Sequence, residues 1–184
     1  MKSKVFPFGL FLLVFPIFFS YQDNESKLTI IEKKITWGFK KSSKRGIDAI
    51  IIHSTYNAVG VDSFSVEGVL RQFKSYGVGA HYLIDRDGRI LRLIDEKNIA
   101  YHAGSSSLPD GRVNVNSTSL GIEIITTLYT SPTEQQYKNV AALVRDIKKR
   151  HTIKYIKGHN EIAPDRKTDP WNFDWIKFNS YLGD

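Results

Sequence analysis

The sequence predicts one α/β domain in which helices cover a central β-sheet. Two stretches, Ile47 to Ile52 and Leu120 to Thr126, are rich in β-branched apolar residues, as is typical of strands buried on both faces. Apolar residues recur at helical spacing between these stretches and after them. The length of 184 residues suits one domain with a substantial core, and 41% apolar and 24% charged residues are ordinary for a globular protein.

The segment between the two buried strands predicts a helix followed by a hairpin. The apolar residues of Phe64 to Tyr76 fall on one helical face, with Ser63 or Ser65 as the N-cap. After it, the mostly apolar ranges 80–85 and 89–94 flank an Asp-Gly pair, which is a hairpin signal. We therefore expect a covering helix and two antiparallel strands.

The last third of the chain predicts a long helix, a short strand and a closing helix. Ser131 and Glu134 form a capping-box pattern, and Pro132 between them suits a first helical turn. Ile153 to Ile156 is a short apolar run typical of a strand. Trp171 to Leu182 is rich in aromatic residues and predicts a helix at the end of the domain.

An irregular segment from Gly158 to Pro170 carries candidate functional residues. Its two prolines and small polar residues disfavour regular structure and suit a loop that directs side chains toward a ligand. His159 and Asp169 offer two good zinc ligands, and a third from elsewhere would leave the fourth position open for water. His53 follows a buried strand, where ligands gather in α/β sheets. The alternative is a surface loop whose histidine caps or packs.

Glu123 lies in the middle of a predicted buried strand, where an unpaired charge is costly. It must therefore meet a cation, a proton or water, either in an ion pair that holds the sheet or as a proton acceptor at a cleft. The long polar loop that ends near Ser119 is expected to border the site. His102 and Asn116 in this region are candidate substrate contacts.

The first twenty residues predict an export signal. Lys2 and Lys4 are followed by a nearly continuous apolar run, Val5 to Phe19, which is short for a membrane span of about 20 residues. Because the end of this run lacks the preferred small residues of a cleavage site, an uncleaved membrane anchor is the alternative. Residues 21–46 are interpreted as a linker and a peripheral segment, with a solvated basic run at Lys40 to Arg45.

The chain is basic and has no cysteine. The formal net charge of +7 falls to +5 when Lys2 and Lys4 are removed, which suits anionic partners such as cell-wall polymers. Because the basic residues are scattered and export is predicted, we expect no nucleic-acid partner. The lack of cysteine excludes disulfides, thiolate metal sites, cysteine nucleophiles and an acylated N-terminal cysteine.

Several short motifs stand out along the chain from about Ile47 to the C-terminus. They are Ile51-Ile52-His53, Ala80-His81-Tyr82-Leu83-Ile84 with Arg86-Asp87-Gly88, Tyr101-His102-Ala103-Gly104, Gly121-Ile122-Glu123, and the string from Gly158 to Pro170. Together these motifs resemble those of the zinc-dependent N-acetylmuramoyl-L-alanine amidases, in the AmpD and AmiD branch. This branch is related to phage amidase-lysozymes and peptidoglycan recognition proteins.

The resemblance implies a mixed β-sheet with helices on both sides and a zinc cleft in an amidase domain spanning residues 47–184. It implies His53, His159 and Asp169 as Zn²⁺ ligands, and Glu123 and Lys167 as catalytic residues. The implied reaction is hydrolysis of the amide between N-acetylmuramic acid and L-alanine in peptidoglycan or muropeptides, during cell-wall turnover or recycling. A peptidoglycan-binding or sensing module without turnover is the alternative. We expect a periplasmic or envelope-associated monomer.

Overall fold

The computed structural model describes Met1 and residues 28–183. The predicted export signal and the first residues of the predicted linker therefore lie almost wholly outside the described residues. In the described part, no helix is both long enough and apolar enough to cross a membrane.

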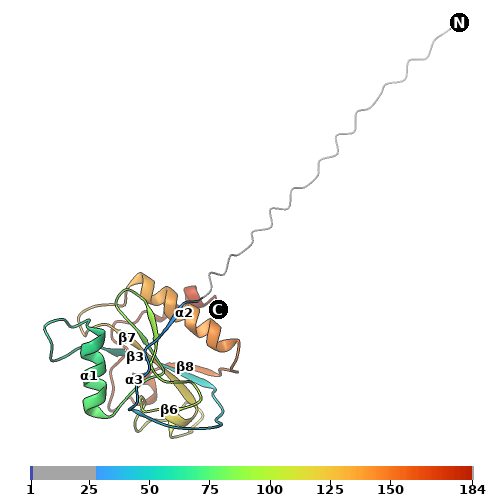
Figure 1. Cartoon of the computed structure of the whole chain (residues 1–184). Coiled ribbons are helices and arrows are strands. Elements are labelled where there is room, and N and C mark those ends of the chain that lie inside the picture. Colours follow the sequence, from blue (N-terminus) through green and yellow to red (C-terminus); the bar gives the residue numbers. More distant parts are fainter. Residues whose placement is uncertain (2–27, 184) are drawn as a thin grey trace.

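A mixed β-sheet forms the centre of the described domain (Figure 1). Strands β4 and β5 are antiparallel, whereas the pairs β1 with β5, β4 with β7, β7 with β3, and β3 with β8 are parallel. Its six strands lie in the order β1 (Ile30–Glu32), β5 (Ile90–Arg92), β4 (Tyr82–Ile84), β7 (Ser119–Ile125), β3 (Ala49–Thr55) and β8 (Tyr155–Gly158). A separate two-stranded sheet pairs β2 (Phe39–Lys40) with β6 (Ile99–Ala100).

Helices cover both faces of the main sheet, as expected. Helices α2 (Glu134–Lys148) and α4 (Trp175–Leu182) pack on one face, where Ile50 and Ile52 of β3 belong to the largest apolar cluster. Helix α1 (Val66–Tyr76) packs on the other face against Leu83 of β4. Beside it, this second face is covered by the one-turn helix α3 (His159–Ile162) and the 103–115 loop, which contact Ile51. A short 3₁₀ turn, η1 (Val115–Ser117), leads into β7.

Side-chain alternation along the central strands decides which residues reach each face. On β3, Ile50 and Ile52 point toward α2 and α4, so Ile51 and His53 point to the opposite face. The same alternation on β7 places Gly121 and Glu123 on that second face. The sheet therefore presents polar side chains where the second face is covered by α1, α3 and loops.

Three predicted local features differ in the structure. Strand β3 continues through His53 to Thr55, so His53 lies within the strand rather than just after it. The segment predicted to be irregular contains the single turn α3, which begins at His159. The predicted strand at 153–156 is displaced toward the C-terminus, to Tyr155–Gly158.

The N-cap of α2 also differs from the prediction. Thr133, not Ser131, is the cap: its hydroxyl accepts the Gln136 N–H, and the Gln136 side chain accepts the Thr133 N–H. The Gln136 amide also donates to the carbonyls of Asp85 and Ile125, at 2.8 and 2.9 Å. Because these interior bonds require Gln136 at the third helical position, tertiary contacts select the cap.

Candidate metal centre

The site begins with two residues paired across neighbouring strands. His53 of β3 lies in register with Glu123 of β7 in the parallel pair. Both side chains point to the face opposite α2, because their neighbours Ile52 and Ile122 are in the α2 core. The sheet register thus fixes a histidine and a carboxylate side by side at the floor of a cleft.

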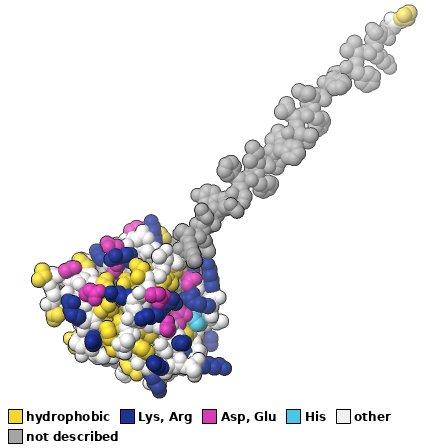
Figure 2. Space-filling model, viewed as in Figure 1, with side chains coloured by type: hydrophobic (Ala, Val, Ile, Leu, Met, Phe, Trp, Pro, Cys, Tyr) yellow, Lys and Arg dark blue, Asp and Glu magenta, His cyan; other side chains and the backbone are white. Residues whose placement is uncertain are grey.

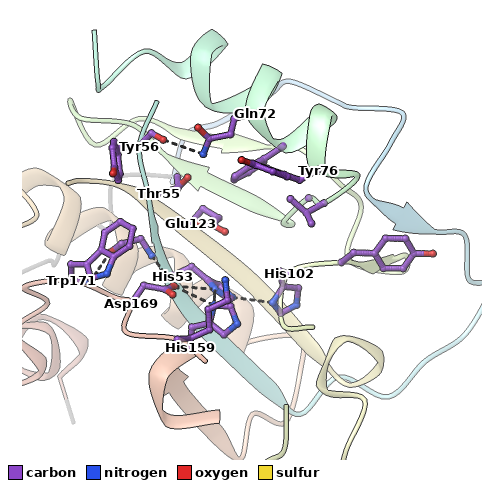
Figure 3. Close-up of a pocket in the computed structure, with 16 residues that line it drawn as sticks. His53, Thr55, Tyr56, Gln72, Tyr76, His102, Glu123, His159, Asp169 and Trp171 are labelled. Carbon is purple, nitrogen blue, oxygen red and sulfur yellow. Dashed lines mark hydrogen bonds and ion pairs between the residues drawn. The ribbon is translucent and has the colours of Figure 1, made fainter. Parts of the chain in front are cut away.

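Helix α3 and the segment after it bring two further groups to His53 (Figure 3). The Nδ1 atoms of His53 and His159 lie 3.0 Å apart, and Asp169 Oδ2 lies 3.5 Å from the first and 3.3 Å from the second. All three residues are buried, with 1%, 4% and 7% exposure for His53, His159 and Asp169. Among the described residues, they form the group whose ligand atoms could share a metal ion.

The three facing atoms behave as a ligand set. His159 uses its other nitrogen, Nε2, to donate to the Ala103 carbonyl at 3.2 Å, and His53 Nε2 lies 3.0 Å from His102 Nδ1. The two Nδ1 atoms and the Asp169 oxygen are therefore left facing one another with their lone pairs. Three such atoms need a proton or a metal cation between them, and two imidazoles with a carboxylate suit Zn²⁺.

The protonation states agree with this role. Burial lowers the pKa of His53 to about 4, so its imidazole is neutral at pH 7. Burial favours the protonated form of Asp169, but contacts with His159 and His53 outweigh it and hold the pKa well below its usual range. A neutral imidazole and an ionised carboxylate are the forms that bind a metal ion.

The pKa of Glu123 shifts in the opposite direction from that of Asp169. Burial raises the pKa of Glu123 to about 8, repulsion from Asp169 adds to the shift, and the Lys167 ammonium opposes it. Its buried Oε2 has no hydrogen-bond partner among the described residues. A buried carboxyl with a raised pKa beside a cleft is suited to exchange a proton with a bound substrate or water.

A cleft of about 270 Å³ opens onto these groups. Lys167, half buried, lines it together with His53, Glu123 and Asp169. Figure 3 shows Gln72 and Tyr76 of α1 on the wall across from the metal group, with Trp171 on the side of Asp169. The aromatic wall residues Tyr56, Tyr76, Tyr101 and Trp171 were not predicted from the sequence.

A sequence signal for this wall does exist at Tyr76. This residue ends the amphipathic helix α1 and is strongly exposed, at 73%. A large exposed aromatic side chain at the end of a covering helix is consistent with a contact surface for a ligand. The other wall residues come from loops and strand ends, where the pattern carries no comparable signal.

Of the two predicted substrate contacts, His102 lines the cleft and Asn116 does not. His102 is buried and touches His53, although its ring also lines the cleft. Asn116 is not among the residues that line the cleft. Its side-chain oxygen instead accepts the backbone N–H groups of His102 and Ala103 at 3.1 and 2.8 Å. These contacts favour a supporting role for Asn116.

Comparisons with known proteins agree with this geometry. A relative from Escherichia coli K12, 1,6-anhydro-N-acetylmuramyl-L-alanine amidase AmpD, is 43% identical over 109 residues, which cover 55% of this chain and 56% of AmpD. The chain thus spans little more than half the length of that curated relative. A crystal structure of an AmpD selenomethionine derivative superposes with a TM-score of 0.72 and 29% identity, covering 82% of this chain and 94% of AmpD.

A second solved structure was determined with a bound substrate. It is the E. coli amidase AmiD in complex with anhydro-N-acetylmuramic acid-L-Ala-D-γ-Glu-L-Lys, with a TM-score of 0.65 and 26% identity over 77% of this chain and 60% of AmiD. The sequence model of the N-acetylmuramoyl-L-alanine amidases matches residues 43–172, which include every residue of the metal group. The chain therefore belongs to the N-acetylmuramoyl-L-alanine amidase family.

Proposed function

We propose that this chain is a zinc-dependent amidase that hydrolyses the amide between N-acetylmuramic acid and L-alanine in peptidoglycan or muropeptides. The observation that carries the proposal is the convergence of His53, His159 and Asp169 beside the buried carboxyl of Glu123. Family membership supports the same reaction, since the relatives are named for it.

The metal ligands in this proposal are His53 Nδ1, His159 Nδ1 and Asp169 Oδ2. Zn²⁺ bound there would supply Lewis-acid polarisation of the scissile carbonyl and activation of water. The three side chains come from β3, from α3 and from the segment after it, so the fold brings them together before any ion binds. Nitrogen and oxygen donors are the only protein ligands open to zinc here, because the chain has no cysteine.

Glu123 and Lys167 would carry out the proton transfer and the charge stabilisation. Glu123 accepts a proton from the attacking water and delivers it to the departing amine of L-alanine, a task that a carboxyl with a raised pKa can perform in both directions. The Lys167 ammonium stabilises the negative charge that develops on the carbonyl oxygen. Electrostatic stabilisation of this kind is worth about 3 kcal/mol.

The cleft supports a muropeptide as the substrate. Its wall combines the exposed phenol of Tyr76 with Tyr101 and Trp171, and flat aromatic side chains pack well against sugar rings and peptide backbone. The related AmiD has been solved with an anhydro-muramyl tripeptide, which is the same chemical class. We propose that this cleft binds the junction between the muramic acid and the stem peptide.

The decisive experiment is digestion of a muramyl tripeptide by the purified protein, with reducing-end and 1,6-anhydro forms tested in parallel. The expected result is release of free L-alanine amino ends by the parent protein. A chelator should stop the release, zinc should restore it, and His53→Ala should be inactive under all conditions. Binding of the tripeptide by the zinc-loaded parent without release would instead show a peptidoglycan-binding or sensing module.

We also propose that residues 1–20 direct export, so that the amidase domain, residues 47–184, acts in the periplasm or at the cell envelope. The support is the pattern of two lysines followed by a nearly continuous apolar run. A cleaved signal would leave the domain free, and an uncleaved one would attach it to the membrane.

A further inference from the structure

A chain of side chains runs from the metal group into the interior of the domain. His53 Nε2 lies 3.0 Å from His102 Nδ1, and His102 Nε2 lies 3.3 Å from the hydroxyl of Ser119. The Ser119 hydroxyl in turn donates to the Val115 carbonyl at 2.6 Å. His53, His102 and Ser119 are all buried, with 1%, 8% and 0% exposure.

The end of this chain fixes the direction of every hydrogen bond in it. The proton of the Ser119 hydroxyl is committed to a carbonyl, so its oxygen can only accept from His102. His102 Nε2 therefore carries the proton, and Nδ1 of the same neutral ring is an acceptor. That acceptor requires His53 to carry its proton on Nε2, which leaves His53 Nδ1 unprotonated toward Asp169 and His159.

The backbone of β7 supports the ring of His102. A Cβ added at Gly121 would come within 2.5 to 2.8 Å of three atoms of that ring, closer than real contacts allow. Gly121 has an ordinary backbone conformation, since its φ is not in the left-handed region. The absence of a side chain at Gly121 therefore serves to leave space for the imidazole.

We propose that His102, supported by Gly121 and oriented by Ser119, is a positioning residue that holds the Nε2-protonated tautomer of His53 and thereby sets the zinc affinity. His102 thus affects zinc binding only through its hydrogen bond with His53. This inference rests on the proposed metal site but not on the identity of the substrate. It also gives the Tyr101-His102-Ala103-Gly104 motif a role other than the substrate contact predicted from the sequence.

The first test is the zinc dissociation constant of the full chain, measured by competition with a chromophoric chelator. Loss of a hydrogen-bond partner behind a ligating histidine weakens metal binding about 10- to 100-fold, and we expect this for His102→Ala. His102→Asn should stay within about threefold of the parent, because its side-chain oxygen falls near the position of Nδ1 and can still accept.

Two serines provide a matched pair. Ser119→Ala removes the acceptor that orients His102, so zinc binding should weaken by about threefold or more. Ser117→Ala removes a hydroxyl from the adjacent η1 turn, where it donates only to the Asn114 carbonyl, and should bind zinc as the parent does. Equal affinities for these two variants would contradict the proposed orientation of His102.

The supporting role of Gly121 has its own test, a double-mutant cycle. Gly121→Ala should weaken zinc binding in the parent, because the added methyl displaces the His102 ring. In a His102→Ala background the same substitution should have little further effect, because the ring is gone. Equal losses in both backgrounds would show that the methyl acts through something other than His102.

A spectroscopic measurement tests the tautomer without any substitution. The chain has only five histidines, so nitrogen-15 spectra of the labelled, metal-free parent can be assigned ring by ring. The expected result is a proton on Nε2 of His53 before zinc is added, and a mixture of tautomers in His102→Ala. A proton on Nδ1 of His53 in the parent would overturn the proposal.

The outcomes also separate this inference from the proposed function. If the parent protein bound no zinc, the proposed metal site itself would be overturned. A parent that binds zinc, with His102→Ala binding it equally tightly, would leave the metal site intact and overturn only the role of His102. The same conclusion would follow if His102→Asn bound zinc as weakly as His102→Ala.

Discussion

Two carboxylates in the same cleft have opposite pKa shifts, and the difference follows from their neighbours. Asp169 lies against two imidazoles, which hold its pKa below the usual range despite burial. Glu123 is buried without a hydrogen-bond partner for Oε2, and burial raises its pKa to about 8. When the pKa values of two neighbouring carboxyl groups differ in this way, the one with the low pKa stays charged as a ligand and the one with the high pKa can transfer protons.

The raised pKa of Glu123 predicts a pH dependence of stability in the metal-free protein. The folded carboxyl titrates near 8, whereas its ordinary value is 4.5, so the folded state retains a proton that the unfolded state loses between these values. Stability contributed by Glu123 is thus present below pH 4.5 and lost as pH rises through 8. Relative to Glu123→Gln, the free energy of unfolding of the parent should fall by on the order of a few kcal/mol as the pH rises over this range.

The measurement is urea unfolding of both proteins with a chelator at pH 5, 7 and 9. Other buried groups titrate in both proteins, so the difference between them isolates Glu123. A difference in unfolding free energy that stays constant from pH 5 to pH 9 would show that Glu123 is not a buried acid with a raised pKa.

Lys167→Ala should lower kcat without removing the metal. The ammonium is expected to stabilise the developing oxyanion, and loss of one such group costs about 10²- to 10³-fold in rate. Zinc content and affinity should stay near those of the parent, because Lys167 is not in the metal group. Steady-state kinetics on the muramyl tripeptide, with the exposed-lysine variant Lys40→Ala as the control, would check this. Equal kcat for Lys167→Ala and the parent would exclude Lys167 from the mechanism.

At the scale of secondary-structure elements, strands and helices with a repeating apolar pattern could be predicted from the sequence. Contacts between elements that are distant in the sequence could not. The β-branched runs predicted β3 and β7, and the apolar face of Phe64 to Tyr76 predicted α1. The capping pattern at Ser131 was misleading, because Thr133 with Gln136 forms the same kind of cap and Gln136 also bonds two strand-end carbonyls. Such interior bonds leave no trace in local sequence.

The candidate site was predictable only in part. Glu123 stands out as a charge in a buried strand, and the family motifs imply the three metal ligands. The residues behind them were not found, because Ser119 and Gly121 look like ordinary strand residues until the ring of His102 is placed against them. Their contacts with His102 depend on the loop before β7 folding back over the sheet, which no local pattern encodes.

Gln136→Ala should destabilise the domain far more than the same substitution at the neighbouring Gln135. It removes the capping-box acceptor and the donor to two buried carbonyls, which together are worth about 2 to 4 kcal/mol. Gln135→Ala, one residue earlier on the exposed side of α2, should change stability by less than about 0.5 kcal/mol. Urea unfolding of the zinc-loaded variants would compare them, and equal losses would contradict the account of the α2 cap.

At the scale of the whole molecule, the positive net charge suits an anionic polymer, and the face in Figure 2 has no single basic stripe. On the face shown in Figure 2, lysine and arginine side chains are interspersed with acidic and apolar ones. The formal charge of the chain remains positive after the first twenty residues, at +5 once Lys2 and Lys4 are subtracted from +7. A weak general attraction to anionic cell-wall polymers fits this distribution, and the absence of a nucleic-acid partner stays a prediction.

Export is tested by expressing the full chain and a variant without residues 2–20, then fractionating the cells. The full chain should place amidase activity in the periplasm or the membrane fraction, and the shortened chain should keep it in the cytoplasm, because the apolar run is the export determinant. A mass corresponding to loss of the segment would identify a cleaved signal, whereas full mass in the membrane fraction would identify an anchor. Full-length protein confined to the cytoplasm would contradict export.

The zinc site itself is tested most directly by an anomalous difference map, collected at the zinc absorption edge, from crystals of the protein grown with zinc. One strong peak is expected about 2.0 to 2.2 Å from His53 Nδ1, His159 Nδ1 and a carboxylate oxygen of Asp169. A peak held by other residues, or none at this position, would contradict it.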